Sequence, residues 1–419
     1  MTKKVDSTIV SIIHPVCCGL DVHKKKISAC LITVNDLGEE QFEILEFGTF
    51  TEELIHLRDW LTMHDCPIVA MESTGVYWRP VHNVLEGFME VILVNARHIK
   101  NVPGRKTDIS DSKWLAGLLR HGLLRGSFIP PKDVRQWREL TRLRRVYTES
   151  LADNKRRVHK LFETANIKID SVASDLFGMT GRNLISQLCA KESELSMKDV
   201  QMSAKGRLKP KVKELYSSVQ GFFEDHHRFQ LISMMSIISG LETEIAAISQ
   251  RLDQLLASHQ DLLERLDAVP GINKKSAQSI LSEVGITLDE FICTAALASW
   301  AGLCPGNNES AGKRKSGRSS VHGHPLKTIL IEVAWAAIKK KDSYYRDKYY
   351  RLKVRRGPKK AIVAIAHRIS KAIFHIIKHG ESYKERGQQW LDHITKKRIT
   401  YRLKRQAKQL GYDLVPCAD

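Results

Sequence analysis

The hydrophobic pattern of this chain changes its period at Pro130. Before that residue, short apolar runs alternate with polar turns, which is typical of β-strands. After it, apolar residues recur every three or four positions, which is typical of α-helices. A chain of 419 residues is long enough for two or three domains, each with its own core. We therefore expect an α/β domain over residues 1–130, followed by mainly helical domains.

The first domain is predicted to open with a β-meander and to continue as an α/β sheet. Strands are expected at residues 18–22, 27–34, 42–50, 67–71 and 91–94. A turn is expected at 35–38, and Thr51 is the expected N-cap of a helix between the third and fourth strands. A meander followed by alternating helices and strands is typical of an α/β sheet.

Residues 131–265 are predicted to form a basic helical and coiled-coil region. The apolar residues of its second half keep a 3-4-3-4 spacing, the seam of a coiled coil. The positions are Leu231, Met234, Ile238, Leu241, Ile245, Ile248, Leu252 and Leu255, then His259, Leu262 and Leu266. An amphipathic helix packed on its own domain fits this spacing as well as an intermolecular coil, because spacing does not identify the partner.

The balance of charge predicts a polyanionic partner. The chain has 66 Lys and Arg against 47 Asp and Glu, a formal net charge of +19, so nucleic acid is expected.

We expect no membrane-spanning helix, because charged residues interrupt each apolar run before the ~18 residues that a span needs. We expect no signal peptide either. The cysteines lack the spacing of a zinc site, so reduced thiols in a cytoplasmic protein are expected.

Single carboxylates stand at the ends of the predicted elements of the first domain. Asp21 interrupts one apolar strand and Glu72 ends another, while Asp108 and Asp111 precede a helix, three positions apart. Each alone is typical of a helix cap or a salt-bridge partner. Together, in one small domain of a cationic chain, they predict a site for divalent cations that prefer oxygen ligands. Two such cations are suited to phosphodiester cleavage or transfer.

Residues 266–385 are predicted to form a second functional domain. Its opening segment places Pro270 and Gly271 between two helical runs. This is typical of a helix-hairpin-helix, whose turn amides bind a DNA phosphate, and also of a plain interhelical turn.

A serine candidate follows in the same domain. Residues 302–308 have the composition of a loop and lead to Ser310 beside several lysines and arginines. A serine exposed among cations is a candidate nucleophile toward phosphorus, although a solvated basic loop has the same composition. Ser316, which directly precedes Gly317, is the competing candidate.

Three further segments leave two interpretations open. His322 and His324 are more typical of a polar turn than of metal ligands. The basic run 355–360 indicates a phosphate-contacting loop or a solvated surface, and residues 386–419 a basic tail. A group of four tyrosines fits either stacking on nucleic-acid bases or a packed face with a basic rim. Its members are Tyr344, Tyr345, Tyr349 and Tyr350.

The ordered set of motifs closely resembles the DEDD transposases of the insertion sequence 110 family. The matching segments, within residues 16–385, are GLDVHK, MESTGVYW, KTDISDSKWLAGLL, LTRLRRVYTESLADNKRRVHKLFE, EDHHRF, LDAVPGI, LASWAGLCPGNNESAGKRKSGR and LIEVAWAA. The resemblance implies a RuvC-like, RNase H-type centre that binds Mg²⁺ through Asp21, Glu72, Asp108 and Asp111. It also implies that Ser310 forms a covalent link to DNA, although Ala311 stands where many relatives have glycine.

The resemblance predicts a prokaryotic, nucleoid-associated DNA transposase or site-specific recombinase that cleaves and rejoins DNA to excise and insert its own element. It implies an element-encoded non-coding guide RNA, for which the Arg-rich helices at 135–160 are candidate contacts. A coiled-coil seam favours a dimer or tetramer. The alternatives are a RuvC-like junction endonuclease without a covalent intermediate, and a non-enzymatic nucleic-acid-binding protein with a degenerate acidic centre.

Overall fold

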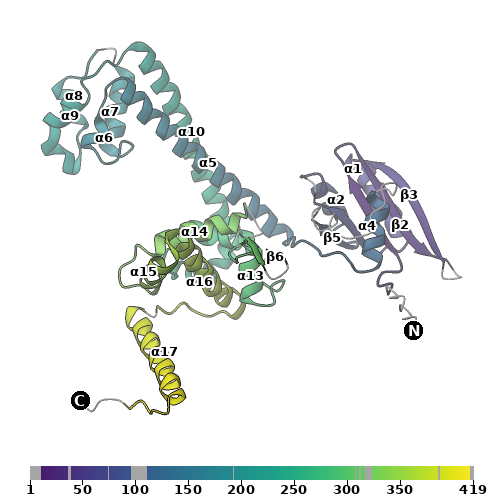
Figure 1. The fold of residues 1–419 in the computed structure, drawn as a ribbon. Helices are drawn as coiled ribbons and strands as arrows, with labels where there is room; N and C mark the ends of the chain where they lie inside the picture. Colours follow the sequence, from purple (N-terminus) through teal and green to yellow (C-terminus); the bar gives the residue numbers. More distant parts are fainter. Residues whose placement is uncertain are drawn as a thin grey trace. The chain divides into compact units, whose positions relative to one another are not determined.

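The chain divides into two compact units, Met1–Ile129 and Pro130–Asp419. The computed structural model describes residues 11–35, 39–73, 75–95, 111–191, 193–306, 308–310, 313–316, 323–385 and 387–415 (Figure 1). Each unit is considered by itself below.

The first unit is built on a five-stranded mixed sheet. Its strands are β1 (Cys17–Val22), β2 (Lys26–Val34), β3 (Glu40–Gly48), β4 (Ile68–Glu72) and β5 (Glu90–Val94), in the order β3-β2-β1-β4-β5. The first three strands form an antiparallel meander, whereas β4 pairs in parallel with β1 and β5 in parallel with β4. This arrangement confirms the predicted α/β, RNase H-like fold class. Of the turn expected at 35–38, positions 36–38 lie outside the described residues.

Helices cover both faces of this sheet. One face packs against α1 (Thr51–Met63) and α2 (Trp78–Leu85) around Leu20, Leu57 and Met71. The other face packs against α4 (Asp111–Arg120). The predicted cap at Thr51 is wrong by one position, because Phe50 is the N-cap and makes no side-chain cap bond.

The second unit begins with a pair of long helices, α5 (Lys132–Thr164) and α10 (Asp225–Leu255), which lie side by side (Figure 1). Short helices at the far end of the pair share one core with it, centred on Val158, Leu184 and Leu231. These are α6 (Ile169–Val172), α7 (Met179–Ala190), α8 (Met197–Ser203), η1 (Gly206–Lys211) and α9 (Val212–Ser218).

The predicted seam is not carried by one continuous helix. α10 ends at Leu255, a 3₁₀ turn η2 (Ala257–His259) follows, and α11 (Gln260–Asp267) resumes the helical run. Leu231, Ile238 and Leu252 of the seam are buried. Within the chain, α10 packs against α5, so α5 is the intramolecular partner of the seam.

One described helix, α10, is long and apolar enough to cross a membrane by length and composition alone, although the sequence predicted no such span. An 18-residue window of this helix has a mean hydropathy of 1.5, and 17% of the window is buried. Glu242 and Glu244 are the only charged residues between Arg228 and Arg251, so the run is interrupted less than the sequence reading assumed. Length and composition alone would therefore allow α10 to cross a membrane.

The remainder of the second unit is mainly helical, as predicted. Its elements are α12 (Lys274–Val284), α13 (Thr294–Trp300), β6 (Asn308–Ser310), β7 (Lys313–Ser316), α14 (Pro325–Ala337), α15 (Tyr344–Arg356), α16 (Pro358–His379) and α17 (Gly387–Gln409). The apolar helix α16 packs against α11, α13, α14 and α15. The loop expected at 355–360 is wrong, because α15 continues through Arg356 and α16 starts at Pro358. Gly357, at φ 75°, supplies the single-residue break that glycine allows.

Candidate active site

Asp21 and Glu72 lie beside each other on adjacent parallel strands. Leu20 of β1 pairs with Met71 of β4, so the next residue on each strand is a carboxylate. Side chains alternate between the faces of a strand. Cys17 on β1, and Ile68 and Ala70 on β4, belong to the core beneath α4, so Asp21 and Glu72 project on the face that α4 covers.

Asp111 begins α4, the helix that covers this face of the sheet. It is the first residue of the helix, and the next residue, Ser112, is fully buried with its Oγ 3.1 Å from the Oγ of Ser28. Ser28 is the cross-strand partner of Asp21. The first turn of α4 therefore lies against the sheet at the level of Asp21. Asp108, the fourth predicted acid, lies outside the described residues.

The donor set of this site fits a hard divalent cation. Asp21, Glu72 and Asp111 offer carboxylate oxygens, which Mg²⁺ and Mn²⁺ prefer. The thiols on the same strands do not compete, because burial raises the pKa of Cys17 to about 12 and that of Cys30 to about 11. Thiols with such pKa values stay protonated at neutral pH, whereas a metal requires the thiolate.

Several residues that position the carboxylates were missed by the sequence reading. His23 Nε2 lies 3.0 Å from Asp21 Oδ2, and the Asp21 side chain is 27% exposed. Gly19 lets the backbone of α4 approach β1, since an added Cβ would lie 2.2 Å from the carbonyl oxygen of Ser112. His23 and Gly19 both flank Asp21 within GLDVHK, so the motif held the signal. The contact between Ser28 and Ser112 joins residues 84 positions apart and left no local signal.

The serine candidates lie in the strands of a β-hairpin rather than in an irregular basic loop. Ser310 ends β6 and pairs with Lys313, the first residue of β7. Ser316 pairs with Asn308 at the opposite end of the hairpin.

The predicted helix-hairpin-helix is formed by α11 and α12, but its turn is packed inside the unit. Val269 and Ile272 are buried, and a Cβ added to Gly271 would lie 2.3 Å from the carbonyl oxygen of Val333 in α14. A turn that packs this closely on a helix favours the plain interhelical turn over a phosphate-binding turn.

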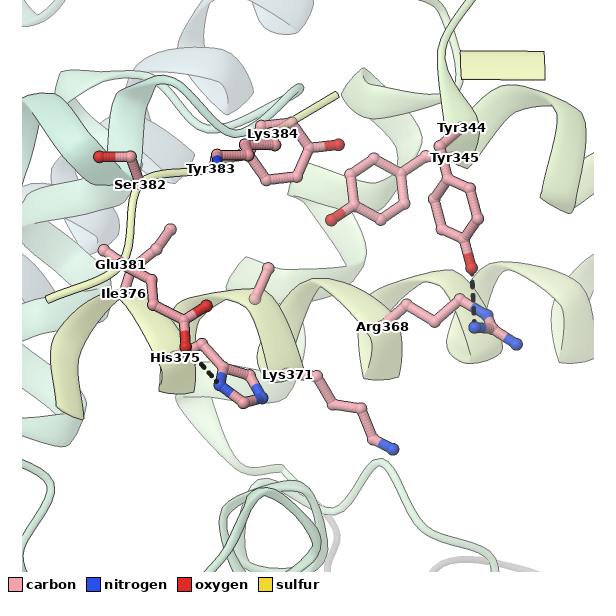
Figure 2. Close-up of a pocket in the computed structure, with 11 residues that line it drawn as sticks. Tyr344, Tyr345, Arg368, Lys371, His375, Ile376, Glu381, Ser382, Tyr383 and Lys384 are labelled. Carbon is pink, nitrogen blue, oxygen red and sulfur yellow. Dashed lines mark hydrogen bonds and ion pairs between the residues drawn. The ribbon is translucent and has the colours of Figure 1, made fainter. Parts of the chain in front are cut away.

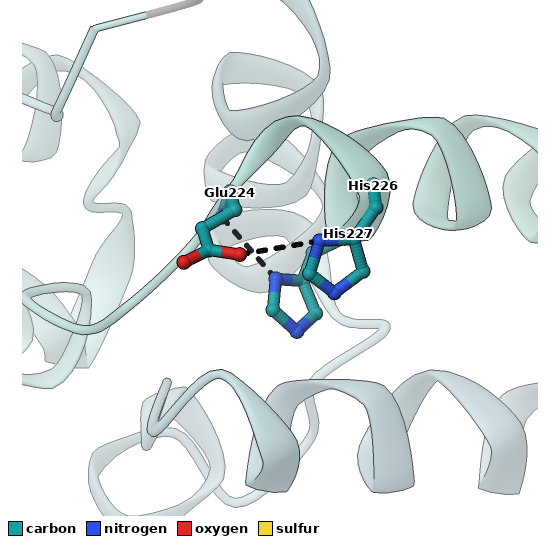
Figure 3. A group of neighbouring side chains, drawn as sticks. All are labelled: Glu224, His226 and His227. Atoms are coloured by element: carbon teal, nitrogen blue, oxygen red, sulfur yellow. Dashed lines mark hydrogen bonds and ion pairs between the residues drawn. The ribbon is translucent and has the colours of Figure 1, made fainter.

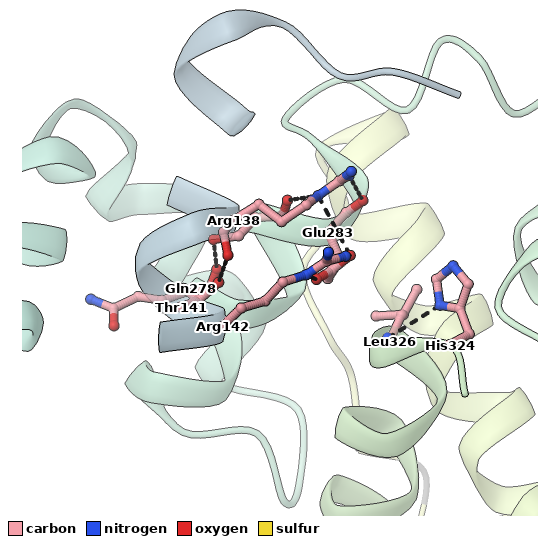
Figure 4. A network of polar contacts seen from close by, with 8 residues as sticks. Arg138, Thr141, Arg142, Gln278, Glu283, His324 and Leu326 are labelled. Carbon is pink, nitrogen blue, oxygen red and sulfur yellow. Dashed lines mark hydrogen bonds and ion pairs between the residues drawn. The ribbon is translucent and has the colours of Figure 1, made fainter. Parts of the chain in front are cut away.

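Arginines at the start of α5 form hydrogen bonds and ion pairs with α12 (Figure 4). Arg142 donates through Nε and Nη2 to the two carboxylate oxygens of Glu283 at 2.9 and 3.0 Å. Arg138 donates to the backbone oxygens of Ser282 and Glu283, and the buried Arg144 donates to Gln278 at 2.7 Å. These arginines of the proposed RNA-binding segment are therefore occupied by α12.

Two histidine motifs act as helix caps. The Nδ1 of His324 accepts a hydrogen bond from the backbone of Leu326 at 3.2 Å and caps α14, which agrees with a polar turn (Figure 4). His322 lies outside the described residues. Within EDHHRF, Glu224, His226 and His227 place their donor atoms within 4.8 Å of one another (Figure 3). The Nδ1 of His227 accepts from the backbone of Glu224, so this atom already closes the capping box of α10 and is not open to a metal.

Two of the four tyrosines of α15 pack in the core of the unit, and the other two do not. Tyr345 and Tyr349 are buried and belong to the core, whereas Tyr350 is exposed. Tyr344 lines a pocket of about 710 Å³ and accepts a hydrogen bond from Arg368 Nη1 at 2.8 Å (Figure 2). The packed face therefore accounts for two of the rings.

Comparison with known proteins matches both units. A transposase model of the DEDD, IS110 type matches residues 18–167, and a model described as the transposase IS116/IS110/IS902 family matches residues 263–351. No curated protein matches the chain. Two solved structures of Thermus thermophilus RuvC, one in complex with a Holliday junction substrate, are similar at 12% and 14% identity. They cover 27% of this chain and 100% and 99% of the RuvC chains, with TM-scores of 0.21 and 0.20. The two family models together cover more than half of the sequence, and the chain belongs to the IS110 family of transposases.

Proposed function

We propose that this transposase excises and inserts its element by a strand transfer that uses a Mg²⁺ centre and a serine nucleophile. The Mg²⁺ ligands are Asp21, Glu72, Asp108 and Asp111, and the nucleophile is Ser310. The observation that carries the proposal is the placement of Asp21 and Glu72 side by side beneath α4, which begins with Asp111. Carboxylates that lie close together repel one another unless a cation lies between them, so a shared cation would stabilise this arrangement.

The chain's own residues divide the work as follows. The carboxylates bind the cation, and His23 holds Asp21 through the 3.0 Å contact between Nε2 and Oδ2. When bound, the cation supplies charge stabilisation to the oxygens of the reacting phosphate. The hydroxyl of Ser310 forms a bond to phosphorus as the bond from phosphorus to a deoxyribose oxygen breaks. The hydroxyl proton leaves the serine, and the departing sugar oxygen takes up a proton. Attack by a second strand's hydroxyl reverses these steps and rejoins the DNA.

The finer assignments of partner and location belong to the same proposal. An element-encoded guide RNA is supported by the net charge of +19, and the exposed Arg156 and Arg157 of α5 are better candidates than Arg138, Arg142 and Arg144. A dimer or tetramer is supported by the exposed apolar side chains of Phe229, Ile232 and Ile237 on α10. We place the protein in the prokaryotic cytoplasm, associated with the nucleoid.

The alternative is a RuvC-like junction endonuclease that hydrolyses DNA without a covalent intermediate. One observation favours it: the three described carboxylates lie within the first unit, and hydrolysis needs no residue from the hairpin of the second. The two functions differ in whether a covalent link between protein and DNA forms.

The test is a covalent-trapping assay on the full-length protein with labelled donor DNA, Mg²⁺ and the element's RNA. An adduct that is lost in Ser310→Ala and Asp21→Asn but kept in Ser316→Ala is the expected result. Ser316→Ala is a matched control because it removes the same hydroxyl from the other end of the hairpin. Cleavage without an adduct would instead identify the hydrolytic endonuclease, and an adduct lost only in Ser316→Ala would move the nucleophile to that residue.

A further inference from the structure

A cationic groove lies in the second unit next to the serine hairpin. It has a volume of about 1020 Å³ and is bounded by the segment 302–305, the start of α14, the end of α15 and one side of α16. Six of its lining residues carry positive charge, and no Asp or Glu is among the lining residues in the described part of the chain. The cations are Lys327, Arg356, Lys359, Lys360, Arg368 and Lys371.

Among the described residues, none of the six groove cations forms an ion pair with an acid. Burial lowers the pKa of His367 in the groove, and the neighbouring Lys371 and Arg368 lower it further. Burial likewise lowers the pKa of Lys348 on α15, and four arginines add to the effect. By contrast, the pocket on the other side of Arg368 contains Glu381, 3.4 Å from His375 (Figure 2). Uncompensated cations of this kind are stabilised by a ligand that carries several negative charges.

The start of α16 adds to the attraction for phosphate. Gly357, its N-cap, makes no side-chain cap bond, and Pro358 begins a helix of 22 residues. The positive end of the helix dipole favours an anion at this position, and the exposed Lys359 and Lys360 stand in the first turn.

The dimensions and lining of the groove fit a nucleic-acid backbone. Lys360 and Lys371 are separated by roughly 16 Å along the helix at 1.5 Å per residue. One DNA strand has a phosphate about every 3.4 Å of helix axis, so this length corresponds to about five phosphates. The floor between the cations is apolar and includes Leu352, Val363 and Ala364.

The position of the groove identifies which strand it would hold. Its wall at Gly302–Pro305 continues into β6 with only two residues between Pro305 and Asn308, and β6 ends at Ser310. We propose that this groove binds the phosphates of the DNA strand next to the bond that Ser310 attacks. The identity of the strand rests on the proposed function, whereas the binding of DNA in the groove does not.

The first experiment measures binding of a labelled DNA oligonucleotide to the full-length Ser310→Ala protein at several salt concentrations. The groove variant adds Lys359→Gln and Lys360→Gln. The matched control adds Lys339→Gln and Lys340→Gln instead, because these lysines are also adjacent, exposed and in the same unit but do not line the groove. Both variants lose the same charge, and thermal unfolding checks that both stay folded.

We expect the groove variant to bind DNA at least about tenfold more weakly than the control, with a salt slope reduced by about 2, since each phosphate contact contributes about 0.9. Equal losses in the two variants would overturn the groove as a DNA site. Repeating the titration with RNA of the same sequence separates the two nucleic acids. A loss confined to RNA would also overturn the proposal.

The trapping assay separates this proposal from the proposed function. With Ser310 restored, the groove variant is expected to form adduct more slowly at subsaturating DNA than the Lys339/Lys340 control. If the unmodified protein forms no adduct but the groove variant still loses DNA binding, the serine mechanism fails and the groove stands. If adduct forms equally in both variants, the mechanism stands and the groove does not position the strand.

Discussion

Gly19 of β1 and Ser112 of α4 are in direct backbone contact: an added Cβ at Gly19 would lie 2.2 Å from the Ser112 carbonyl oxygen and 2.5 Å from the Ala116 nitrogen. Neither atom belongs to a flexible side chain, so α4 itself must move to admit a methyl group. Because Asp111 precedes Ser112, such a movement shifts one carboxylate of the candidate metal site relative to Asp21.

Gly19→Ala is therefore expected to lower the free energy of unfolding of the first unit by about 1–3 kcal/mol, as overpacking does, and to reduce DNA cleavage. Denaturant unfolding and a cleavage assay measure the two effects. Gly117→Ala on α4 is the control, because nothing lies within 4 Å of the added Cβ. Alanine is also more favourable than glycine inside a helix by about 1 kcal/mol. Equal behaviour of the two variants would contradict the close approach of α4.

Glu283→Gln is expected to destabilise the second unit. Glu283 is 2% exposed and accepts from Arg142 at both carboxylate oxygens, so the substitution removes the counter-charge of Arg142, whose side chain is 43% exposed, and of Arg138, whose side chain is 16% exposed. Breaking a fully buried ion pair costs about 3–5 kcal/mol, and because Arg142 is partly solvated the expected loss here is smaller, about 1–3 kcal/mol. Glu332→Gln is the matched control, since Glu332 is 65% exposed, pairs with Arg145 at 3.1 Å and is expected to contribute about 0–1 kcal/mol. Urea unfolding compares them, and similar midpoints would show that the α5–α12 network is not structural.

The sequence predicted the first unit better than the second, for a physical reason. Strands β1 and β4 are short, buried and bounded by turns, so their ends and the carboxylates Asp21 and Glu72 could be recognised locally. The charged face of α5 gives no such signal. Arg144 is buried, whereas the next residue, Arg145, is not. The buried Arg144 donates a hydrogen bond to Gln278, which lies 134 positions away in the sequence.

The basic segments of the second unit misled the sequence reading in the same way. Lys, Arg, Ser and Gly are typical of loops, yet β6 and β7 form a ladder, and α15 and α16 are interrupted only at Gly357. Tertiary packing of the apolar face of α16 decides the second case, and composition alone does not contain that information.

The stability of the second unit is expected to fall as the pH drops below about 6.5. Burial lowers the pKa of His324, of His227 and of His367, so the unfolded chain binds more protons than the folded one in this range. Stability therefore rises with pH and is lost as the pH falls through the ordinary histidine pKa toward the lower folded values. His324 faces Trp300, with ring centroids 4.2 Å apart, and its charged neighbours are Glu283, Arg142 and Arg138.

His324→Asn tests this pH dependence, because asparagine keeps an N-cap acceptor but does not titrate. The change in denaturation midpoint between pH 7.5 and pH 5 is expected to be smaller in this variant than in the unmodified protein. His393→Asn, at an exposed position of α17, is the control and is expected to leave the difference unchanged. An undiminished pH dependence in His324→Asn would assign the effect to other groups.

Mg²⁺ is expected to reverse the order of stability of the unmodified protein and its Asp21→Asn variant. We propose that Asp21, Glu72 and Asp111 bind one cation, so in the presence of a chelator the substitution is expected to remove like-charge repulsion and to raise the melting temperature of the first unit. With Mg²⁺ in excess, binding to the folded state stabilises the unmodified protein by RT ln(1 + [Mg²⁺]/Kd), about 2.7 kcal/mol at a hundredfold excess over Kd. The Asp21→Asn variant lacks one ligand and is therefore stabilised less by Mg²⁺.

The control is Glu43→Gln, which removes one carboxylate from β3 at a side chain that is 49% exposed. This variant is expected to respond to Mg²⁺ as the unmodified protein does. Thermal unfolding of the full-length proteins with and without Mg²⁺ measures all three. A crossing of the melting temperatures for Asp21→Asn alone is the result that a shared cation requires, whereas parallel shifts in all three would mean that Mg²⁺ acts on the chain without binding at this centre.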